Sequence, residues 1–177
     1  MLKQDTTEVL RDCEASLIPS GVKVTLCKGS LVVITQALGN AYTVHVNGNL
    51  ARVAGIDGDA LGMVILAEPD IDPQSTLEEQ VWAILRNCFD PEIPVNIVDL
   101  GLIYECHILS EEAEQDVIIK MTLTAPACGM GPVLVADIEQ RIRSLSGVRA
   151  VKIDLVFDPP WDRNMMSDVA KLQLGML

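Results

Sequence analysis

Residues 121–145, MTLTAPACGMGPVLVADIEQRIRSL, decide the fold of the domain around them, because they read as a strand end, a loop and a helix. The strand leads into this stretch with apolar residues at a period of two, which is typical of a strand with one better-buried face. The residues on that face are Val117, Ile119, Met121 and Leu123. We therefore expect a buried strand that runs directly into the loop.

Helical spacing takes over after the loop. The apolar residues now recur at intervals of four, four and three, which places them on one face of a helix. They are Leu134, Ile138, Ile142 and Leu145. Pro132 suits the first helical position, where its missing N–H costs nothing. The helix is thus expected to begin near Pro132, and Cys128 lies just ahead of its N-terminus.

Cys128 is the first candidate functional residue. Unpaired backbone N–H groups and the helix dipole favour negative charge at a helix N-terminus, and so favour thiolate over thiol. Gly129 and Gly131 remove the side chains on either side of Met130, which leaves room for a metal or a partner atom near the sulfur. The alternative is that Cys128 is a small buried hydrophobe in a tight turn.

The charge of the chain argues against two classes of partner. The formal net charge is -12 and the sequence pI is near 4.4, whereas nucleic acids and anionic membranes are bound through clustered Lys and Arg. We expect a protein or metal-centred partner, with no nucleic acid and no membrane. No window has the length of a membrane span and the first residues lack the apolar block of a secretory signal, so we expect a cytoplasmic location.

The cysteines limit the metal chemistry. Their odd number and the lack of a CxxC pair favour a reducing compartment over a disulfide framework, and do not match a zinc finger. They are Cys13, Cys27, Cys88, Cys106 and Cys128. An iron-sulfur cluster normally takes four protein thiolates, and no four are grouped in this sequence. Any cluster or iron here is expected to be bound transiently or shared.

Residues 1–66 are expected to form a small all-β domain. Short runs rich in Val, Ile and Thr predict strands, and turn residues separate them. These runs are 22–26, 30–36, 41–46 and 50–55. Asn47-Gly48 is the strongest hairpin signal in the chain, and His45 and Cys27 are read as ordinary sheet positions. Residues 67–76, with two prolines and three acids, are interpreted as a linker.

Residues 77–177 are expected to form an α+β domain with the order α-β-β-α-β and a short terminal helix. Thr76 and Glu79 form a capping box for the first helix, whose apolar stripe includes Cys88. Strands are expected at about 101–109 and, after a left-handed stop at Gly147, at 148–157. Ser167 is a candidate cap for the last helix.

Acidic residues between the first helix and the next strand are further candidates. Asp90 and Glu92 could do acid–base chemistry, but acids beside prolines are more often turn formers. Asp99 lies between Val98 and Leu100 in an apolar run, so it must find a hydrogen-bond partner if it is buried.

Adjacent residues Cys106 and His107 point to opposite faces of a strand, so they cannot both bind one metal without a bulge.

Long segments of this sequence resemble the PaaD-like group of metal-sulfur cluster assembly proteins. In the second domain these are DPEIPVNIVDLGLIYE, MTLTAPACGMGPVLV and LVFDPPWDRNMMSDVAKLQLGM, and in the first they are RDCEASLIPSG, ITQALGNAYTV and DALG. Strings of this length are far more specific than a short motif such as a lone CxxC.

The resemblance implies a non-catalytic accessory role, in which the protein helps deliver or insert iron-sulfur clusters into recipient proteins. Cys128 is then the expected contact to the metal, and Asp99 matches the acidic position of the motif. The other expected supporting residues are Asp90, Glu92, Thr124, Gly129 and Gly131. The implied partners are cluster carriers or scaffold proteins and recipient apoproteins. The first domain is absent from many relatives, and partner recognition is the task we assign to it.

One thiolate per chain cannot hold a cluster alone, so Cys128 is expected to act across a homodimer interface, with a small-molecule thiol, or with a partner's ligands. Two other functions stay open. In a thiol enzyme, Cys128 would need His45 or His107 within hydrogen-bond reach as a base. In a structural adaptor, Cys128 would only pack, while the acidic surface and Trp161 would bind another assembly protein.

Overall fold

The computed structural model describes residues 6–126 and 129–177. By its internal contacts the chain divides into two compact units, Met1–Glu68 and Pro69–Leu177. We call them the N-terminal unit and the C-terminal unit and describe each by itself.

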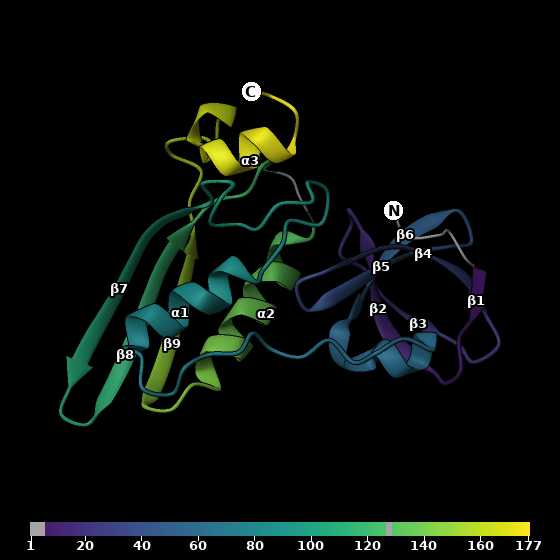
Figure 1. The fold of residues 1–177 in the computed structure, drawn as a ribbon, viewed down its shortest axis with the longest axis horizontal. Helices are drawn as coiled ribbons and strands as arrows, with labels where there is room; N and C mark the ends of the chain where they lie inside the picture. Colours follow the sequence, from purple (N-terminus) through teal and green to yellow (C-terminus); the bar gives the residue numbers. More distant parts are fainter. Residues whose placement is uncertain (1–5, 127–128) are drawn as a thin grey trace. The chain divides into compact units, whose positions relative to one another are not determined.

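The N-terminal unit is built on a six-stranded antiparallel sheet of order β1-β4-β5-β6-β2-β3 (Figure 1). Its strands are β1 (Thr6–Glu8), β2 (Cys13–Ile18), β3 (Lys23–Leu26), β4 (Leu31–Leu38), β5 (Ala41–Val46) and β6 (Asn49–Ala54). The four predicted strands are confirmed as β3 to β6. β1, β2 and the 3-10 helix η1 (Gly55–Leu61) were not predicted, but the all-β class of the unit is confirmed by its single six-stranded sheet.

Individual residues of this unit can be compared with the predictions made from the sequence. Asn47 and Gly48 have φ values of 48 and 80 and join Val46 to its partner Asn49 in the β5–β6 hairpin, as predicted. Cys13 is buried in the core of the unit, where burial raises the pKa of its thiol. Cys27 was predicted to occupy an ordinary sheet position, and this was wrong, because β3 ends at Leu26 and Cys27 lies exposed directly after it. His45 lies in β5, as predicted.

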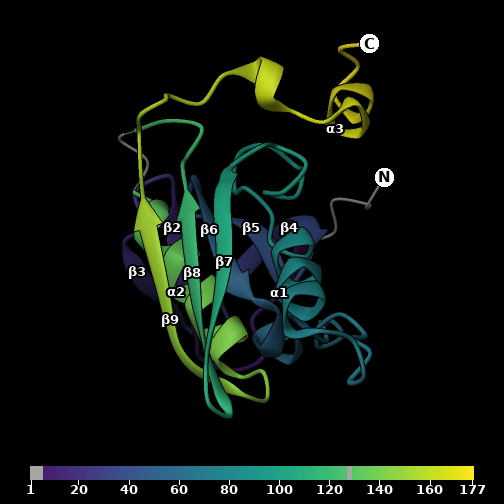
Figure 2. The same ribbon diagram turned by 90° about the vertical axis from the view of Figure 1, so that its left-hand side faces the viewer.

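The C-terminal unit has the predicted order α-β-β-α-β. Its elements are α1 (Leu77–Arg86), β7 (Ile103–Glu111), β8 (Glu114–Met121), α2 (Gly131–Arg143), β9 (Val148–Leu155), η2 (Arg163–Met165) and α3 (Asp168–Gln173). β7 pairs antiparallel with β8, and β8 pairs parallel with β9 through the α2 crossover. Figure 2 shows α1 and α2 behind one face of this three-stranded sheet. The mixed α+β class is therefore confirmed.

The alternation in β8 fills the core between the sheet and α2. Val117, Ile119 and Met121 are fully buried, as are Ile138 and Ile142 of α2. Each such side chain contributes roughly 1.5–3 kcal/mol on transfer from water. The periods of two and 3.6 predicted around the loop are thus confirmed, and they place the loop between a buried strand and a buried helix.

The two helices are joined at one end by a buried cation. Arg141 of α2 is 5% exposed and donates from Nη2 to Oδ1 of Asn87 at 2.7 Å and from Nη1 to Sγ of Cys88 at 3.0 Å. Asn87 ends α1, so the guanidinium also complements the negative end of that helix dipole. Cys88 is core, as predicted. Sequence analysis missed Arg141, although a basic residue between Ile138 and Ile142 on an apolar stripe was the available signal.

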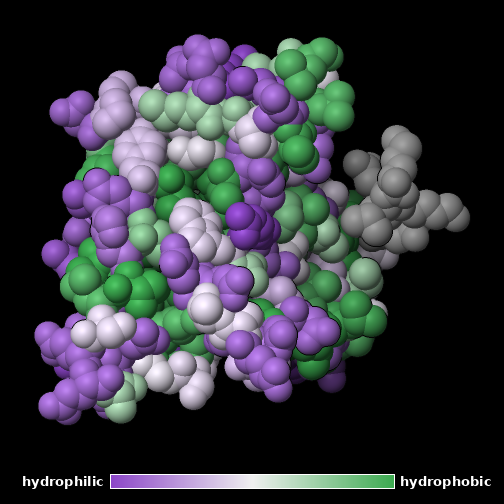
Figure 3. Space-filling model, turned by 60° about the vertical axis from the view of Figure 1, so that its left-hand side comes forward, coloured by the Kyte–Doolittle hydropathy of each residue, from purple (hydrophilic) through white to green (hydrophobic). Residues whose placement is uncertain are grey.

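No helix of the described residues covers the opposite face of the sheet, which is largely charged. Nζ of Lys120 lies 3.2 Å from Oε2 of Glu105, and His107 contacts the same carboxylate at 3.3 Å. Figure 3 shows hydrophilic side chains over much of this side of the unit, with separate apolar patches. His107 is exposed while Cys106 packs against the core, so the prediction that they point to opposite faces is confirmed.

Among the described residues, no helix is long and apolar enough to cross a membrane.

Candidate functional site

Segments far apart in the sequence meet at one end of the three-stranded sheet. β8 and β9 finish there and β7 begins, and we call this the carboxyl end. The segments are residues 96–104, which precede and open β7, and residues 156–167, which follow β9. The loop between β8 and α2 starts at the same end. The sequence motifs that resemble cluster assembly proteins therefore converge in space.

Asp99 joins the two segments. Its Oδ1 accepts a hydrogen bond from Oγ of Ser167 at 2.9 Å, and its backbone oxygen accepts from the N–H of Ser167 at 2.8 Å. Its Oδ2 accepts from Nδ2 of Asn96 at 2.6 Å. Ser167 also caps α3 through the N–H of Ala170, as predicted. The expectation that Asp99 finds hydrogen-bond partners is confirmed, and the structure gives it a positioning role.

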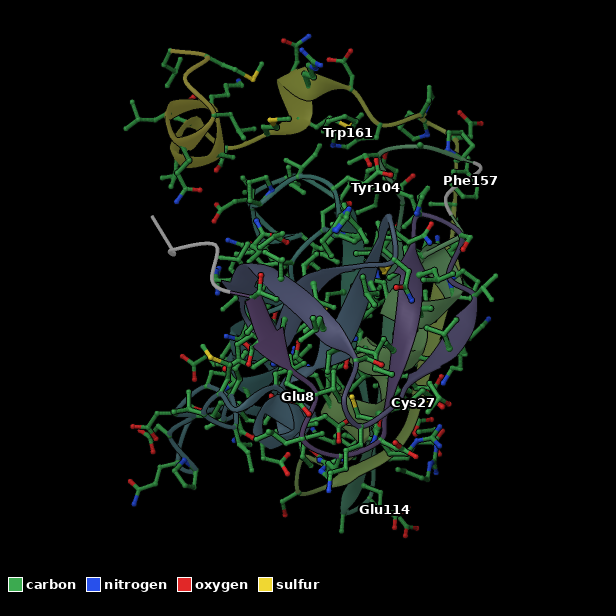
Figure 4. All side chains as sticks on the ribbon, turned by 90° about the vertical axis from the view of Figure 1, so that its right-hand side faces the viewer. Glu8, Cys27, Tyr104, Glu114, Phe157 and Trp161 are labelled. Atoms are coloured by element: carbon green, nitrogen blue, oxygen red, sulfur yellow. The ribbon has the colours of Figure 1, made fainter. Side chains whose placement is uncertain are left out.

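Two aromatic side chains make further links between these segments. Nε1 of Trp161 donates to the backbone oxygen of Leu100 at 2.7 Å, and the hydroxyl of Tyr104 donates to the backbone oxygen of Pro159 at 2.7 Å. Figure 4 shows Tyr104, Phe157 and Trp161 at this end of the unit, with Glu114 at the other. Trp161 is partly buried against the core. Its polar atom is engaged within the chain, so Trp161 is first of all a structural anchor.

Gly101 permits the closest contact at the carboxyl end. Its φ is +76, and a Cβ at this position would lie 2.3 Å from the backbone oxygen of Met165. Only glycine meets both conditions, because other residues rarely adopt this conformation and would collide with backbone rather than with a flexible side chain. The tail after β9 therefore packs directly on the backbone that precedes β7.

Asp90 and Glu92 have different surroundings. Oδ1 of Asp90 accepts hydrogen bonds from the N–H groups of Glu92 and Ile93 at 2.9 and 2.8 Å. Asp90 is 6% exposed. Burial raises the pKa of the Asp90 carboxyl, while the two N–H donors act in the opposite direction. The Glu92 side chain is exposed. Asp90 therefore forms a turn, which was the preferred interpretation of the sequence.

The structure describes the loop after β8 only on either side of the main candidate. Ala127 and Cys128 lie outside the described residues, so the contacts of the Cys128 thiol stay a prediction. Thr124 and Gly129 are half-buried. A Cβ on Gly131 would lie 2.7 Å from Cδ1 of Leu123. The space expected to be open at Gly131 is thus filled by Leu123, and this glycine serves the packing of α2 on the strand end.

Thr122 has an unusual environment in this region. It is fully buried directly after β8, and its hydroxyl has no hydrogen-bond partner among the described residues. A buried unpaired hydroxyl costs roughly 1–3 kcal/mol relative to a paired one. No sequence pattern indicated this environment, because Thr122 occupies an ordinary polar position in the alternation.

Potential metal ligands are sparse in the described part of the chain. Within residues 6–126 and 129–177, no group of three or more His, Cys, Asp or Glu side chains is close enough to hold a metal ion. Burial, with a smaller effect of Glu78, raises the pKa of the Cys106 thiol to about 11, so Cys106 does not readily form the thiolate that binds metals.

A shallow pocket of about 610 Å³ opens at the carboxyl end. Tyr104 and Lys120 line it from the sheet, and Asp158 and Met165 line it from the tail. The combination of a cation, a carboxylate, a phenol and a thioether makes a surface suited to a polypeptide more than to a small apolar ligand.

Comparison with known proteins identifies the family. The sequence profile of the family described as "Iron-sulfur cluster assembly protein" matches residues 78–155. A protein of Porphyromonas gingivalis named Fe-S protein maturation auxiliary factor is 46% identical over 100 residues, which make up 56% of this chain and 92% of that protein. The chain belongs to this family. The resemblance noted in the sequence is thereby confirmed.

Two further relatives agree with this family. Fe-S protein maturation auxiliary factor SufT from Staphylococcus aureus is 33% identical over 87 residues, which are 49% of this chain and 96% of that protein. The crystal structure of a domain of unknown function from Bacillus anthracis superposes with a TM-score of 0.50 at 32% identity, over 57% of this chain and 93% of that one. The family profile lies wholly in the C-terminal unit, whose carboxyl end contains the candidate site.

Proposed function

We propose that this chain is an auxiliary factor in the maturation of iron-sulfur proteins and helps deliver or insert clusters into recipient proteins. The observation that carries the proposal is the 46% identity that spans nearly the whole of a relative named for that role. The cluster is cargo in this function, and the chain acts as an accessory rather than as an enzyme. We place this activity in the cytoplasm, with cluster carriers, scaffold proteins and recipient apoproteins as partners.

Cys128 is the proposed contact to the metal. It precedes α2 by three residues in the sequence, and this helix has 13 residues with no acidic residue in its first turn, so nothing in that turn opposes a thiolate. The described thiols of Cys13, Cys88 and Cys106 are less suitable, because the first two are buried and the third resists ionisation. Asp99, Asp90, Glu92, Thr124, Gly129 and Gly131 are proposed to support the site by shaping the backbone around it.

The ligand count requires a second source of ligands. A cluster needs more than one thiolate, and the described residues offer no preformed metal-binding group. We therefore propose that a second copy of the chain, a small-molecule thiol or a partner protein completes the coordination. Such shared coordination is suited to handing a cluster on, because it is lost when the partners separate.

The decisive experiment compares the wild type with Cys128→Ser after anaerobic reconstitution with iron and sulfide. Iron content and visible absorption are expected to be lost in the variant. Cys27→Ser is the matched control, since it removes an exposed thiol from the N-terminal unit and should retain both signals. Transfer to a recipient apoprotein is then measured for the same three proteins. Equal iron and equal transfer in all three would contradict the role of Cys128.

An adaptor function without metal binding is the second candidate. It is favoured by exposed apolar residues of the C-terminal segment, Val169 and Leu172 of α3, which are 57% and 67% exposed. This function predicts that Cys128→Ser leaves cluster transfer intact, whereas Leu172→Asp weakens it.

The thiol-enzyme hypothesis requires a histidine base. His107 lies on the face of the sheet without helices and contacts Glu105, and an unchanged reaction of the thiol after His107→Gln would contradict that hypothesis.

A further inference from the structure

The strand β9 has a free edge. In the sheet order β7-β8-β9 it has a neighbour on one side only. The N–H of Val156 donates to the backbone oxygen of Met121 at 2.8 Å, so the even-numbered residues of β9 face β8. The backbone groups of Val151, Ile153 and Leu155 therefore point to the other side. No strand of the described residues pairs there, and such an edge is a template for another strand.

The side chains of β9 are charged on one face of the sheet and apolar on the other. Lys152 and Asp154 share the face of the sheet without helices, and their Nζ and Oδ2 atoms lie 3.5 Å apart. Val151, Ile153 and Leu155 turn to the face that carries the core. A second strand at this edge would thus meet apolar residues on one face and one charge of each sign on the other.

A second copy of β9 fits this pattern in one register. When Ile153 lies opposite Ile153 of the second copy, Lys152 lies opposite Asp154 twice by symmetry, and Val151 lies opposite Leu155. Shifting the pairing one step in one direction places Lys152 opposite Lys152, and one step in the other places Asp154 opposite Asp154. Opposite charges across a strand pair stabilise it and like charges destabilise it, so the charges select the first register.

We propose that β9 is a homodimer interface, in which two copies pair antiparallel with Ile153 opposite Ile153. The two three-stranded sheets then form one continuous six-stranded sheet around a two-fold axis. The interface is isologous, as in most soluble dimers. It also satisfies the outward N–H and C=O groups of the odd-numbered residues, which no other described strand pairs.

This dimer keeps the two candidate sites apart. The side chain of Leu155 lies next to the start of α2, since a Cβ on Gly131 would be 3.7 Å from its Cδ1. Leu155 and its symmetry mate are four residues apart along the pair, about 14 Å at 3.4 Å per residue. The dimer thus presents two α2 N-termini side by side rather than one shared site. The proposal does not depend on the function of Cys128, and the two can fail separately.

The test is sedimentation velocity of the full chain over a concentration series up to millimolar. The wild type is expected to dimerise. Lys152→Asp and Asp154→Lys each turn two attractive contacts into repulsive ones, so each is expected to weaken the dimer by about tenfold or more. The double variant restores complementarity and should recover the wild-type dissociation constant. An equimolar mixture of the two single variants should form a heterodimer.

Lys28→Asp is the matched control, because it is the same substitution at an exposed position of the N-terminal unit, outside the three-stranded sheet. Its dimer should match the wild type, and circular dichroism should show that all variants are folded. A wild type that remains monomeric at millimolar concentration would overturn the proposal. So would a dimer that Lys152→Asp affects no more than Lys28→Asp, because the contact would then lie elsewhere.

Discussion

The two ends of the three-stranded sheet are held together by different interactions. At the carboxyl end, Asp99, Trp161 and Tyr104 make hydrogen bonds between residues 55–68 positions apart in the sequence. At the hairpin end, where β7 turns into β8, Arg149 pairs with Asp116 and Glu111 at 2.6 and 3.0 Å, and the Arg149, Asp116 and Glu111 side chains are 41%, 27% and 69% exposed. The carboxyl end is therefore fixed by hydrogen bonds of which those of Asp99 and Trp161 are partly buried, and the hairpin end by solvent-accessible charges.

This difference shows where the chain has been made rigid. Exposed ion pairs contribute little to stability because water and salt screen them, whereas hydrogen bonds to partly buried groups are costly to break. Residues 96–104 and 156–167 are joined by the second kind. Pre-organisation is useful for a site that must hold a ligand briefly and release it, because less ordering is needed at each encounter.

The largest effect is expected at Gly101. Gly101→Ala should destabilise the C-terminal unit by about 3 kcal/mol, since it combines a strained positive φ with a collision against the backbone of Met165. Gly147→Ala at the hairpin end is the control, with φ +86 but nothing within 4 Å of the added Cβ, and should cost about 1 kcal/mol. Both tryptophans, Trp82 and Trp161, lie in this unit, so urea unfolding followed by fluorescence measures it. Equal losses in the free energy of unfolding for the two variants would mean that the carboxyl end is packed no more tightly than the hairpin end.

Asp99→Ala is expected to cost about 2 kcal/mol, because it removes the charged acceptor of Ser167 and Asn96. A double-mutant cycle with Ser167→Ala separates the link to the tail from the link to Asn96. We expect a coupling energy of about 1 kcal/mol between Asp99 and Ser167. Additive losses would mean that the tail is held by packing alone.

The pKa of the Asp90 carboxyl is raised, whereas that of Asp116 at the hairpin end is lowered, so the two groups predict opposite changes of stability with pH. Burial raises the pKa of Asp90, so its contribution to stability is present below the unfolded pKa and is lost as pH rises through the folded one. Asp90→Asn retains an oxygen for both N–H donors and never ionises. The variant should therefore gain stability relative to the wild type as pH rises from about 4 to neutral. A constant difference across that range would show that the Asp90 carboxyl ionises equally in both states.

The smallest effect is expected at the hairpin end. The guanidinium of Arg149 lowers the pKa of Asp116, so this pair stabilises the fold above the unfolded pKa and loses its effect as pH falls through the folded one. Because the pair is solvated, Arg149→Ala should leave the urea midpoint at neutral pH almost unchanged. A loss comparable with that of Asp99→Ala would show that the two ends are equally important.

Local patterns predicted the framework of both units. Runs rich in Val, Ile and Thr predicted β3 to β6, and period-two alternation predicted β8. Helical spacing predicted α1 and α2, with a capping box at α1, and Asn47-Gly48 predicted the β5–β6 hairpin. These features depend on residues within a few positions of one another. β2 was missed because CEASLI alternates weakly and pairs with β6, far along the chain. η1 was missed because a 3-10 helix has no strong spacing of apolar residues.

The candidate site was predicted less completely for the same reason. The sequence indicated that Asp99 needs a partner, but it could not name Ser167, 68 residues away. Gly131 was read as open space, whereas Leu123 fills it. Long-range packing decides such contacts and leaves no local signature. The roles of Thr124 and Gly129 stay predictions, and the role of Cys128 is a prediction that Cys128→Ser tests.

The link between Asp99 and Ser167 has a consequence for biosynthesis. The last residue of the sheet, Leu155, is synthesised before Ser167, so the hydrogen bonds between Asp99 and Ser167 cannot form until the ribosome has added the residues that lead into α3. At about 5–20 residues per second, this interval lasts on the order of one to two seconds, followed by passage through the exit tunnel. The chain thus carries every residue of the sheet before it carries Ser167, so the carboxyl end is the last part of the C-terminal unit whose hydrogen bonds can form.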